Sequence, residues 1–368
     1  MVEWKKLGDI ATLQKTKNKK HLTENAYSIT QAGLVPTKSF FKEKTNITSH
    51  DTSGYYIVEK DWFVYSPSRI DVGSINYLKD DGPVIVSPID VVFSVDANIC
   101  LPSYLLEYFF TYKGKKDLLK RREGVEGMGR RNLPFNAIKS VQIPIPSLSE
   151  QQRIVGILDT FTSSISNLKE QLALRRKQYE HYRDELLDLE GKEGVEMKTI
   201  GEVCDVITGG EVPENTIKGQ QAPTESHPFA VYTNGKDTYG YADTYQVDSD
   251  VVCVSSIGAN TGAIFYKTGK FTPAIRLKVL IPHYGVNTKF LYYASMKIDF
   301  KGRNTGSVPN INANYVKSKS FFLPSLSEQS RIVSFLDTFE ASISNLEAQI
   351  AAREKQYEYY RNKLLTFE

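Results

Sequence analysis

Residues 146–190 read PSLSEQQRIVGILDTFTSSISNLKEQLALRRKQYEHYRDELLDLE, and residues 324–368 read PSLSEQSRIVSFLDTFEASISNLEAQIAAREKQYEYYRNKLLTFE. The two stretches align without a gap over 45 positions, of which 30 are identical. Self-similarity of this kind indicates that the chain contains two copies of one unit. The duplicated stretch therefore decides how the whole chain is organised.

Each copy carries the signals of a long helix. Ser147 with Glu150, and Ser325 with Glu328, have the S-x-x-E spacing of a capping box, and a proline precedes each pair. Apolar residues then recur in alternating steps of four and three, which is the pattern of a coiled-coil seam. The seam positions are Ile154, Leu158, Phe161, Ile165, Leu168, Leu172, Tyr179, Tyr182 and Leu186, and in the second copy Ile332, Leu336, Phe339, Ile343, Leu346, Ile350, Tyr357, Tyr360 and Leu364.

One position in each seam is charged, Arg175 in the first copy and Arg353 in the second. A polar residue on a seam can fix the register of the two helices. A long arginine stem can instead carry its charge out to solvent. The sequence leaves both interpretations open.

The linkers predict how the two helices run. Each helix of roughly 40 residues is about 60 Å long. The stretch 191–200 after the first helix is short, and the next domain, of about 120 residues, has an expected radius of gyration near 14 Å. We therefore expect the second helix to begin near the end of the first and to run back along it, antiparallel.

The residues before each helix form two related globular domains. The openings 4–14 and 197–207 correspond, the ends 132–146 and 310–324 correspond, and 61–77 aligns without a gap with 250–266. Apolar runs, Ser/Gly-rich turns and helical stretches (103–122 and 288–303) indicate mixed α and β structure. The predicted fold class is α+β: mixed α/β domains at 1–145 and 191–323, separated by two long antiparallel coiled-coil helices at 146–190 and 324–368, with an internal pseudo-twofold repeat.

Composition excludes several classes of protein. The 368-residue chain is 40% hydrophobic and has three distant cysteines, which excludes a disordered chain, a collagen-like chain and a disulfide scaffold. No apolar run reaches the roughly 18 residues of a membrane span, and the N-terminus lacks the apolar stretch of a signal peptide. We expect a soluble, cytoplasmic protein with no membrane partner.

The net charge of +3 conceals an uneven distribution. The segment 1–145 carries +5 and 191–323 carries +2, whereas each helical segment carries −2. Lys and Arg neutralise phosphates, and Arg and Asn can bond guanine and adenine edges, so basic domains with polar loops favour a nucleic-acid partner. A solvated surface charge or an ordinary β-turn is the alternative for any one residue. The candidate DNA-binding residues are Lys15, Lys17, Lys19, Ser66, Ser68, Arg69, Arg130, Arg131, Asn132, Tyr232, Asn234, Lys236, Ser255, Asn260, Thr261, Arg303 and Asn304.

Motifs of catalysis are missing from the sequence. Gly258–Gly262 lacks the lysine of a phosphate-binding loop. The Gly-rich stretch EGVEGMGRR lacks the context of a dinucleotide site, and the five scattered histidines have no metal-ligand spacing. We expect neither catalytic residues nor a metal site in this chain.

The order domain, PSLSEQ-type helix, domain, PSLSEQ-type helix resembles the specificity subunit of type I restriction–modification systems. The motif L-S-E-Q-x-R-I-V at 148–155 and 326–333 carries the resemblance, which covers essentially the whole chain. It implies two target recognition domains, each reading one half of a bipartite double-stranded DNA sequence. It also implies that the helices set the spacer and dock two methyltransferase subunits, with a restriction and translocase subunit completing the complex. Because the two loop sets differ, we expect an asymmetric DNA target.

The resemblance places the cofactors S-adenosylmethionine, ATP and Mg²⁺ in the partner subunits, where an adenine would be flipped out and methylated. A coiled-coil scaffold with protein-binding end domains is the alternative function, and an enzyme with an unrecognised site is disfavoured by the missing motifs. The helix positions that we expect to be exposed for partner docking, with an ordinary solvated helix face as the alternative, are Gln151, Arg153, Gln171, Gln329 and Arg331.

Overall fold

The computed structural model describes residues 2–30, 33–40, 51–123, 132–301 and 311–367. These residues form two compact units, one made of Met1–Lys169 with Ala348–Glu368 and the other of Glu170–Glu347. Each unit thus combines one globular domain with adjoining parts of both long helices, whereas the sequence suggested a division into four consecutive segments. Among the described residues, no helix is both long and apolar enough to cross a membrane.

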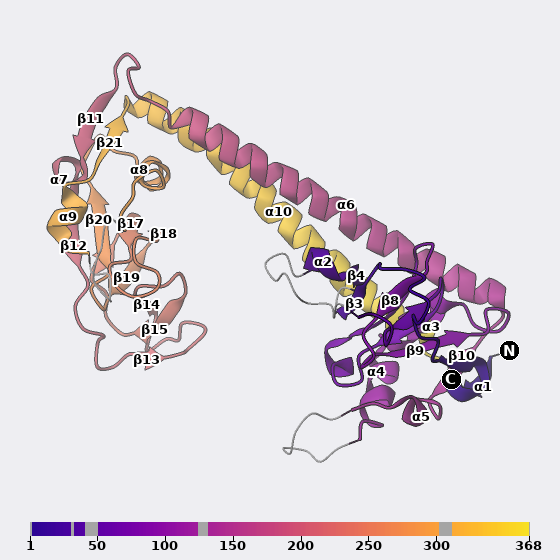
Figure 1. Cartoon of the computed structure of the whole chain (residues 1–368). Coiled ribbons are helices and arrows are strands. Elements are labelled where there is room, and N and C mark those ends of the chain that lie inside the picture. Colours follow the sequence, from indigo (N-terminus) through magenta and orange to yellow (C-terminus); the bar gives the residue numbers. More distant parts are fainter. Residues whose placement is uncertain (1, 31–32, 41–50, 124–131, 302–310, 368) are drawn as a thin grey trace. The chain divides into compact units, whose positions relative to one another are not determined.

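The first unit is an α+β structure (Figure 1). Its main sheet has the order β2-β9-β6-β7 and is antiparallel throughout. Smaller two-stranded sheets pair β1 with β10, β3 with β4 and β5 with β8. The elements are β1 (Glu3–Lys6), α1 (Leu7–Ile10), β2 (Ala11–Gln14), β3 (Tyr27–Thr30), β4 (Gly33–Pro36), α2 (Thr37–Phe40), β5 (Tyr56–Val58), β6 (Phe63–Tyr65), a 3-10 turn (Ile70–Val72), β7 (Ile75–Tyr77), β8 (Val84–Val86), β9 (Val91–Val95), α3 (Pro102–Phe109), α4 (Tyr112–Leu119), α5 (Phe135–Ile138) and β10 (Gln142–Ile145).

The second unit repeats this frame with different additions. Its sheet of order β12-β20-β17-β18 matches the first unit's main sheet strand for strand, and β11 pairs with β21 as β1 pairs with β10. A five-stranded sheet of order β13-β15-β14-β19-β16 stands in place of the two-stranded sheets β3-β4 and β5-β8. The elements are β11 (Glu196–Thr199), α7 (Ile200–Val203), β12 (Cys204–Thr208), β13 (Ile217–Lys218), β14 (Phe229–Tyr232), β15 (Thr238–Ala242), β16 (Val247–Asp248), β17 (Val251–Val254), β18 (Ile264–Lys267), β19 (Lys270–Pro273), β20 (Lys278–Pro282), α8 (Thr288–Ser295), α9 (Ala313–Lys317) and β21 (Ser320–Leu323).

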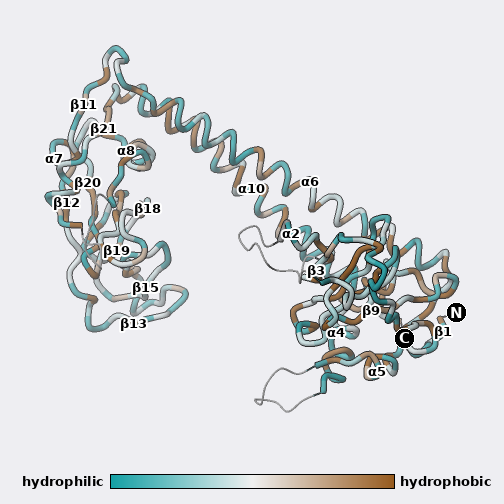
Figure 2. The backbone as a smooth tube through the Cα atoms, in the orientation of Figure 1, coloured by the Kyte–Doolittle hydropathy of each residue, from teal (hydrophilic) through white to brown (hydrophobic). Residues whose placement is uncertain are grey.

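The long helices are α6 (Leu148–Leu186) and α10 (Leu326–Leu365). Figure 2 shows apolar residues recurring along both of them between hydrophilic stretches. In the first unit the start of α6 meets the end of α10, where the ring of Phe161 stacks on Tyr360 at 5.3 Å. In the second unit the end of α6 meets the start of α10, where Tyr182 contacts Phe335 and Phe339. The predicted antiparallel pairing is confirmed.

Each helix pair is also part of the core of its unit. Ile154 and Leu158 of α6 and Leu365 of α10 are buried together with residues of α3 in the first unit. Ile332 and Leu336 of α10 are buried with residues of α8 in the second. The helices therefore act as a wall of each domain, because burying their apolar seam stabilises both elements.

One helix prediction was wrong in extent. Of the described residues 288–301, only Thr288–Ser295 are helical, whereas the counterpart stretch 103–122 contains both α3 and α4. The side chain of Thr111 accepts a hydrogen bond from Gly114 N and so caps the start of α4. The corresponding position in the second unit is Lys297, which has no oxygen with which to accept such a bond.

Candidate nucleic-acid interface

A strand–turn–strand element recurs in both units at the place where the sequence predicted recognition loops. In the first unit the turn between β6 and β7 is closed by the bond from Ser66 N to Ser74 O, at 3.0 Å. In the second, Ser255 N donates to Ala263 O at 2.8 Å between β17 and β18. Gly73 and Gly262 occupy matching positions with φ of 81° and 84°, a conformation that glycine adopts without strain. The ungapped match of 61–77 with 250–266 is thus confirmed by geometry.

The same turns hold the ends of two basic loops. Leu133 N donates to Pro67 O at 3.0 Å, and Ile311 N donates to Ser256 O at 2.9 Å. The loops themselves, 124–131 and 302–310, lie outside the described residues. With them, the candidates Arg130, Arg131, Arg303 and Asn304 lie outside the described residues.

The other candidates of the first unit are presented on its surface. Lys15, Lys17, Lys19, Arg69 and Asn132 are exposed, and Ser68 is half-buried. The structure brings Lys15 and Asn132 together, since both line a hollow of about 400 Å³. A lysine and an amide facing one hollow suit a phosphate together with a base edge.

Asp90 lines the same hollow as Lys15 and Asn132. It is buried, and this burial raises the pKa of its carboxyl to about 7. The sequence analysis did not single this residue out, because an acid in a turn reads as a solvated one. Only its position beneath the surrounding loops makes its pKa unusual.

Asn234 of the second unit is a structural centre, which differs from its predicted role. Its side-chain oxygen accepts a hydrogen bond from Ser256 N at 2.8 Å, and its side-chain amide donates to the carbonyl of Ile275. Asn260 donates its amide to Asn234 O at 3.1 Å. These bonds use the polar atoms that a base contact requires, so Asn234 organises the loops.

Three hydroxyl candidates are also corrected. Ser66, Ser255 and Thr261 are buried, so their side chains do not reach a ligand at the surface. Ser255 Oγ donates to Asn234, and Thr261 Oγ1 donates to Gly258 O at 2.6 Å. Short hydroxyl side chains in tight turns satisfy nearby backbone groups, and here that ordinary turn chemistry prevails.

The remaining candidates of the second unit surround a lysine. Lys267 Nζ lies 3.8 Å from the centre of the Tyr232 ring and donates to Lys236 O at 2.7 Å. One face of the half-buried Tyr232 is therefore covered by a cation, whereas the side chain of Lys236 is exposed.

Arg276 is a candidate site residue that the sequence did not indicate. Ile275 and Arg276 both have positive φ, 51° and 60°, which costs about 1–3 kcal/mol for residues other than glycine. Four contacts hold this turn: Ile275 N donates to Gly210 O, Arg276 N to Gly209 O, Ser256 Oγ to Arg276 O and the Asn234 amide to Ile275 O. The side chain of Arg276 is exposed.

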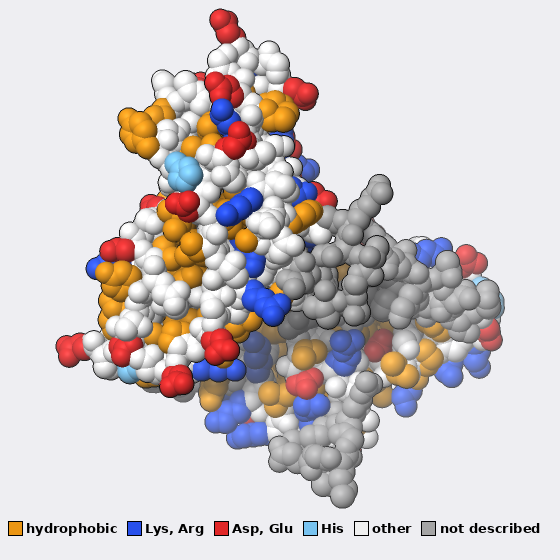
Figure 3. Space-filling view, turned by 90° about the vertical axis from the view of Figure 1, so that its left-hand side faces the viewer, with side chains coloured by type: hydrophobic (Ala, Val, Ile, Leu, Met, Phe, Trp, Pro, Cys, Tyr) orange, Lys and Arg blue, Asp and Glu red, His pale blue; other side chains and the backbone are white. Residues whose placement is uncertain are grey.

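Lys278 adds to the positive charge beside Arg276. It is buried, and its pKa is lowered by burial and by the neighbouring Arg276. The sequence gives no signal for the left-handed turn at Ile275 and Arg276, because neither Ile nor Arg prefers that conformation. Figure 3 shows that charges of both signs are interspersed over the face of the second unit that it presents.

Comparisons with known proteins decide the family. The model of the type I restriction modification DNA specificity domain matches residues 1–174 and 192–353. The specificity subunit of the type I restriction enzyme EcoR124I/EcoR124II of Escherichia coli is 31% identical over 402 aligned residues, covering 100% of this chain and 94% of the relative. This chain belongs to the family of type I specificity subunits.

Solved structures agree with the fold of a specificity subunit. The S subunit of the type I restriction–modification system from M. genitalium superposes with a TM-score of 0.62 at 14% identity, covering 100% of this chain and 97% of that one. The HsdS subunit from Thermoanaerobacter tengcongensis gives 0.52 at 17% identity, covering 99% and 96%.

The helix faces of this specificity subunit differ from the predicted docking set at two positions. Gln151 and Gln329 are 0% and 1% exposed, so the prediction that they are exposed docking residues was wrong. Gln151 Nε2 donates to Ile99 O and Pro146 O, and its oxygen accepts from Leu101 N at 2.9 Å. From the sequence, a glutamine near the start of a helix is expected to be exposed, but here the adjoining loop covers it.

The other docking candidates are exposed. Arg153 pairs with Glu150 at 2.7 Å, Arg331 pairs with Glu328 at 2.7 Å, and Gln171 is on the helix surface. Ion pairs at such exposed sites contribute little to stability. These side chains therefore stay candidates for contacts with a partner subunit.

The seam arginines of the specificity subunit stack on aromatic rings. The guanidinium of Arg175 lies 5.5 Å from the centre of the Phe339 ring, and that of Arg353 lies 5.8 Å from Phe161. Both arginines are half-buried. The two contacts are equivalent in the repeat, since each arginine meets the phenylalanine of the other copy. Such a cation–π contact favours one register of the helices while keeping the charge partly solvated.

Proposed function

We propose that this specificity subunit reads an asymmetric, bipartite DNA sequence, with one half-site for each unit. The observation that carries the proposal is the matched frame with unmatched additions. The two units share the four-stranded sheet and the turn that holds a basic loop, but they differ in the sheets built around that frame. A shared frame places both loop sets in the same way, and different loops read different bases.

Arg276 is the residue to which we assign base reading in the second unit. An exposed guanidinium on this turn is suited to bidentate bonds with guanine, because four hydrogen bonds fix the backbone that carries it before DNA binds. The clustering of strain at Arg276 fits a binding site, where strained backbone is commonly retained.

The long helices set the spacer between the half-sites and dock the partner subunits in this proposal. Half-sites read from one face of B-DNA lie about one helical turn apart, some 34–36 Å. We propose two adenine methyltransferase subunits together with restriction and translocase subunits as partners. The chemistry of methylation and cleavage then belongs to those subunits, which would hold S-adenosylmethionine, ATP and Mg²⁺. The coiled-coil scaffold with protein-binding ends is not favoured, because the family match covers both domains.

Mapping of methylated adenines tests this proposal. The chain is co-expressed with its cognate modification subunit in a host that lacks other methyltransferases, and the modified bases are sequenced. We expect one asymmetric motif with a fixed spacer and an adenine methylated on each strand. Cells expressing the modification subunit alone are the control. The absence of a bipartite motif would overturn the proposal.

One chimaera and one deletion variant test the separate roles of the first domain and of the long helices. Replacing residues 15–132 by those of another family member should change one half of the motif and leave the other intact. Deleting seven residues within 154–189, together with the matching seven of α10, should shorten the spacer or abolish assembly. A change in both half-sites, or an unchanged spacer with full activity, contradicts the respective role.

A further inference from the structure

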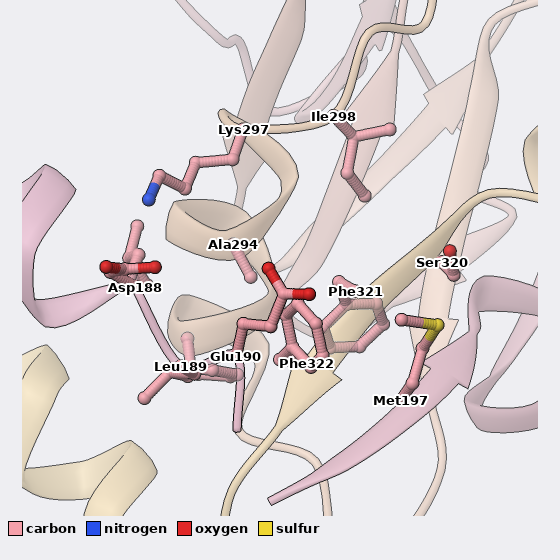
Figure 4. Close-up of a pocket in the computed structure, with 12 residues that line it drawn as sticks. Asp188, Leu189, Glu190, Met197, Ala294, Lys297, Ile298, Ser320, Phe321 and Phe322 are labelled. Carbon is pink, nitrogen blue, oxygen red and sulfur yellow. The ribbon is translucent and has the colours of Figure 1, made fainter. Parts of the chain in front are cut away.

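A cavity of about 280 Å³ lies in the second unit, between α8, β21 and the residues that follow α6. Figure 4 shows the small side chain of Ala294 on α8 with Phe321 and Phe322 of β21 and Glu190 around it. The cavity is separate from the turn that carries Arg276.

The internal repeat identifies what the cavity lacks. Gln151 accepts a hydrogen bond from Leu101 N at the start of α3, and Gln329 accepts one from Asn287 N at the start of α8. The two helices therefore begin at equivalent points, which makes Tyr104 equivalent to Phe290 and Tyr108 equivalent to Ala294. The strand registers Lys6 with Gln142 and Thr199 with Ser320 make β10 and β21 equivalent in the same way.

In the first unit, two tyrosines occupy the corresponding space. Tyr104 OH donates to Pro144 O at 2.8 Å, and Tyr108 OH donates to Gln142 O at 3.0 Å. Both side chains are fully buried. The first unit thus fills the gap between helix and strand with phenol rings and uses strand carbonyls as acceptors.

In the second unit the same four positions line the cavity. They are Phe290, Ala294, Ser320 and Phe322. Neither phenylalanine nor alanine has a hydroxyl, and alanine has no ring, so these positions supply no phenol to the strand. The cavity lies where a tyrosine at position 294 would extend. Leucine and phenylalanine side chains form an apolar wall, and Asp188, Glu190 and Lys297 also line the cavity.

We propose that this cavity is a docking pocket for a tyrosine side chain of the modification subunit. The inference rests on the proposed assembly with that subunit. The first unit shows which group fits, a phenol ring whose hydroxyl donates to a strand carbonyl. A protein partner is favoured over a free small molecule because Met197, which lines the cavity, is 63% exposed and continues the apolar wall onto the surface.

The pocket makes the two halves of the subunit unequal. The first unit satisfies its own site with Tyr108, and only the second unit keeps the site open for a partner. Two copies of the modification subunit would then bind with different affinities, the tighter one at the second unit. A buried aromatic anchor in a preformed pocket is the kind of contact that dominates a protein interface.

The first experiment needs no substitution. p-Cresol, a small-molecule analogue of the tyrosine side chain, is titrated into the full-length chain. Its binding is followed by the NMR chemical shifts of the backbone amides. We expect saturable shifts at Ala294 and Phe322. p-Cresol should also weaken binding of the purified modification subunit. No shift at these residues, or no competition, would overturn the proposal.

The second experiment fills the pocket. Ala294→Tyr should raise the melting temperature of the chain, abolish p-cresol binding and weaken the tighter of two modification-subunit binding steps at least tenfold in calorimetry. Ala222→Tyr adds a tyrosine at an exposed position of the same unit and is the matched control, expected to change none of these. If Ala294→Tyr does not fold, Ala294→Leu takes its place.

The outcomes separate this inference from the proposed function. A filled pocket with unchanged partner affinity shows a packing gap and overturns the docking role, while a bipartite methylation motif from the unaltered chain still stands. Loss of that motif in the unaltered chain would count against the proposed function itself.

Discussion

Arg361 Nε donates a hydrogen bond of 2.8 Å to Glu107 Oε2, which joins the end of α10 to α3 within the first unit. The side chains are only 15% and 17% exposed. Tyr357 OH donates to the same carboxylate at 2.9 Å, and the guanidinium lies 4.2 Å over the Tyr357 ring. The domain and the long helix are therefore joined by a buried polar cluster as well as by apolar packing.

Arg361→Ala should lower the free energy of unfolding by about 2–4 kcal/mol. Removing one partner leaves the Glu107 carboxylate buried without its counter-charge, which is costly. Urea denaturation measures the loss. Arg153→Ala is the control, because its ion pair is exposed and should contribute less than about 1 kcal/mol. Equal losses for the two variants would contradict a structural role for the buried pair.

Gln151→Leu and Gln329→Leu should each destabilise the chain by about 1–3 kcal/mol. Each substitution removes the partners of a helix-start N–H and of two carbonyls while leaving those groups buried. Thermal unfolding and urea titration report the change. Gln171→Leu, on the exposed helix surface, is expected to have almost no effect. Unchanged stability in the first two variants would contradict a structural role for the buried glutamines.

Arg276→Ala should relax specificity in one half of the methylated motif. A bidentate arginine–guanine contact provides about 1–3 kcal/mol of discrimination, which corresponds to roughly fivefold to 150-fold. Sequencing of methylated DNA should show one degenerate position in the half-site read by the second unit and an intact other half. Lys198→Ala removes a half-buried, ion-paired charge from the same unit and controls for a general loss of charge. If the motif stays unchanged in Arg276→Ala, another residue reads that base.

Asp90 should make stability depend on pH. Its folded pKa of about 7 lies above the value of about 3.9 expected in the unfolded chain, so the folded state holds a proton that the unfolded state loses. Its contribution is present in full below about pH 4 and is lost as the pH rises to about 7. At pH 8, Asp90→Asn should therefore be more stable than the unaltered chain, by up to about 4 kcal/mol.

Urea titrations between pH 4 and pH 8 check this prediction for Asp90. The difference between the variant and the unaltered chain should grow with pH. Asp81→Asn is the control, because Asp81 is exposed and its pKa is lowered by Lys60. A gap between Asp90→Asn and the unaltered chain that stays constant with pH would show that Asp90 is not protonated in the fold.

The helices and the duplication could be predicted from residues alone. A 4–3 apolar pattern over many turns has one stable solution, since burying the seam requires a second helix. The turn at 255–262 was also located correctly, because Gly and Ser in such a run mark a turn by their own backbone preferences. These features depend on neighbours in the sequence or on the internal repeat.

The roles of single polar residues could not be predicted in this way. Asn234 and Ser255 look like surface residues of a polar loop, yet the fold turns them inward to hold the turn at Arg276. Gln151 looks like an exposed helix residue, yet it is fully buried. In each case the hydrogen-bond partner lies on a segment that is distant in the sequence. A local sequence pattern does not show which distant segment will supply that partner.

The sequence by itself determined that this protein has two copies of one plan, two paired helices and two different basic domains. Periodicity, capping residues and charge are properties of residues that are close together in the sequence, so they can be recognised from the sequence alone. Only the tertiary structure decided which polar side chains face solvent, which turn carries a strained arginine and where one unit lacks the tyrosine that the other has. Those properties depend on how distant segments pack together, because packing must bury apolar surface and give every buried polar group a hydrogen-bond partner.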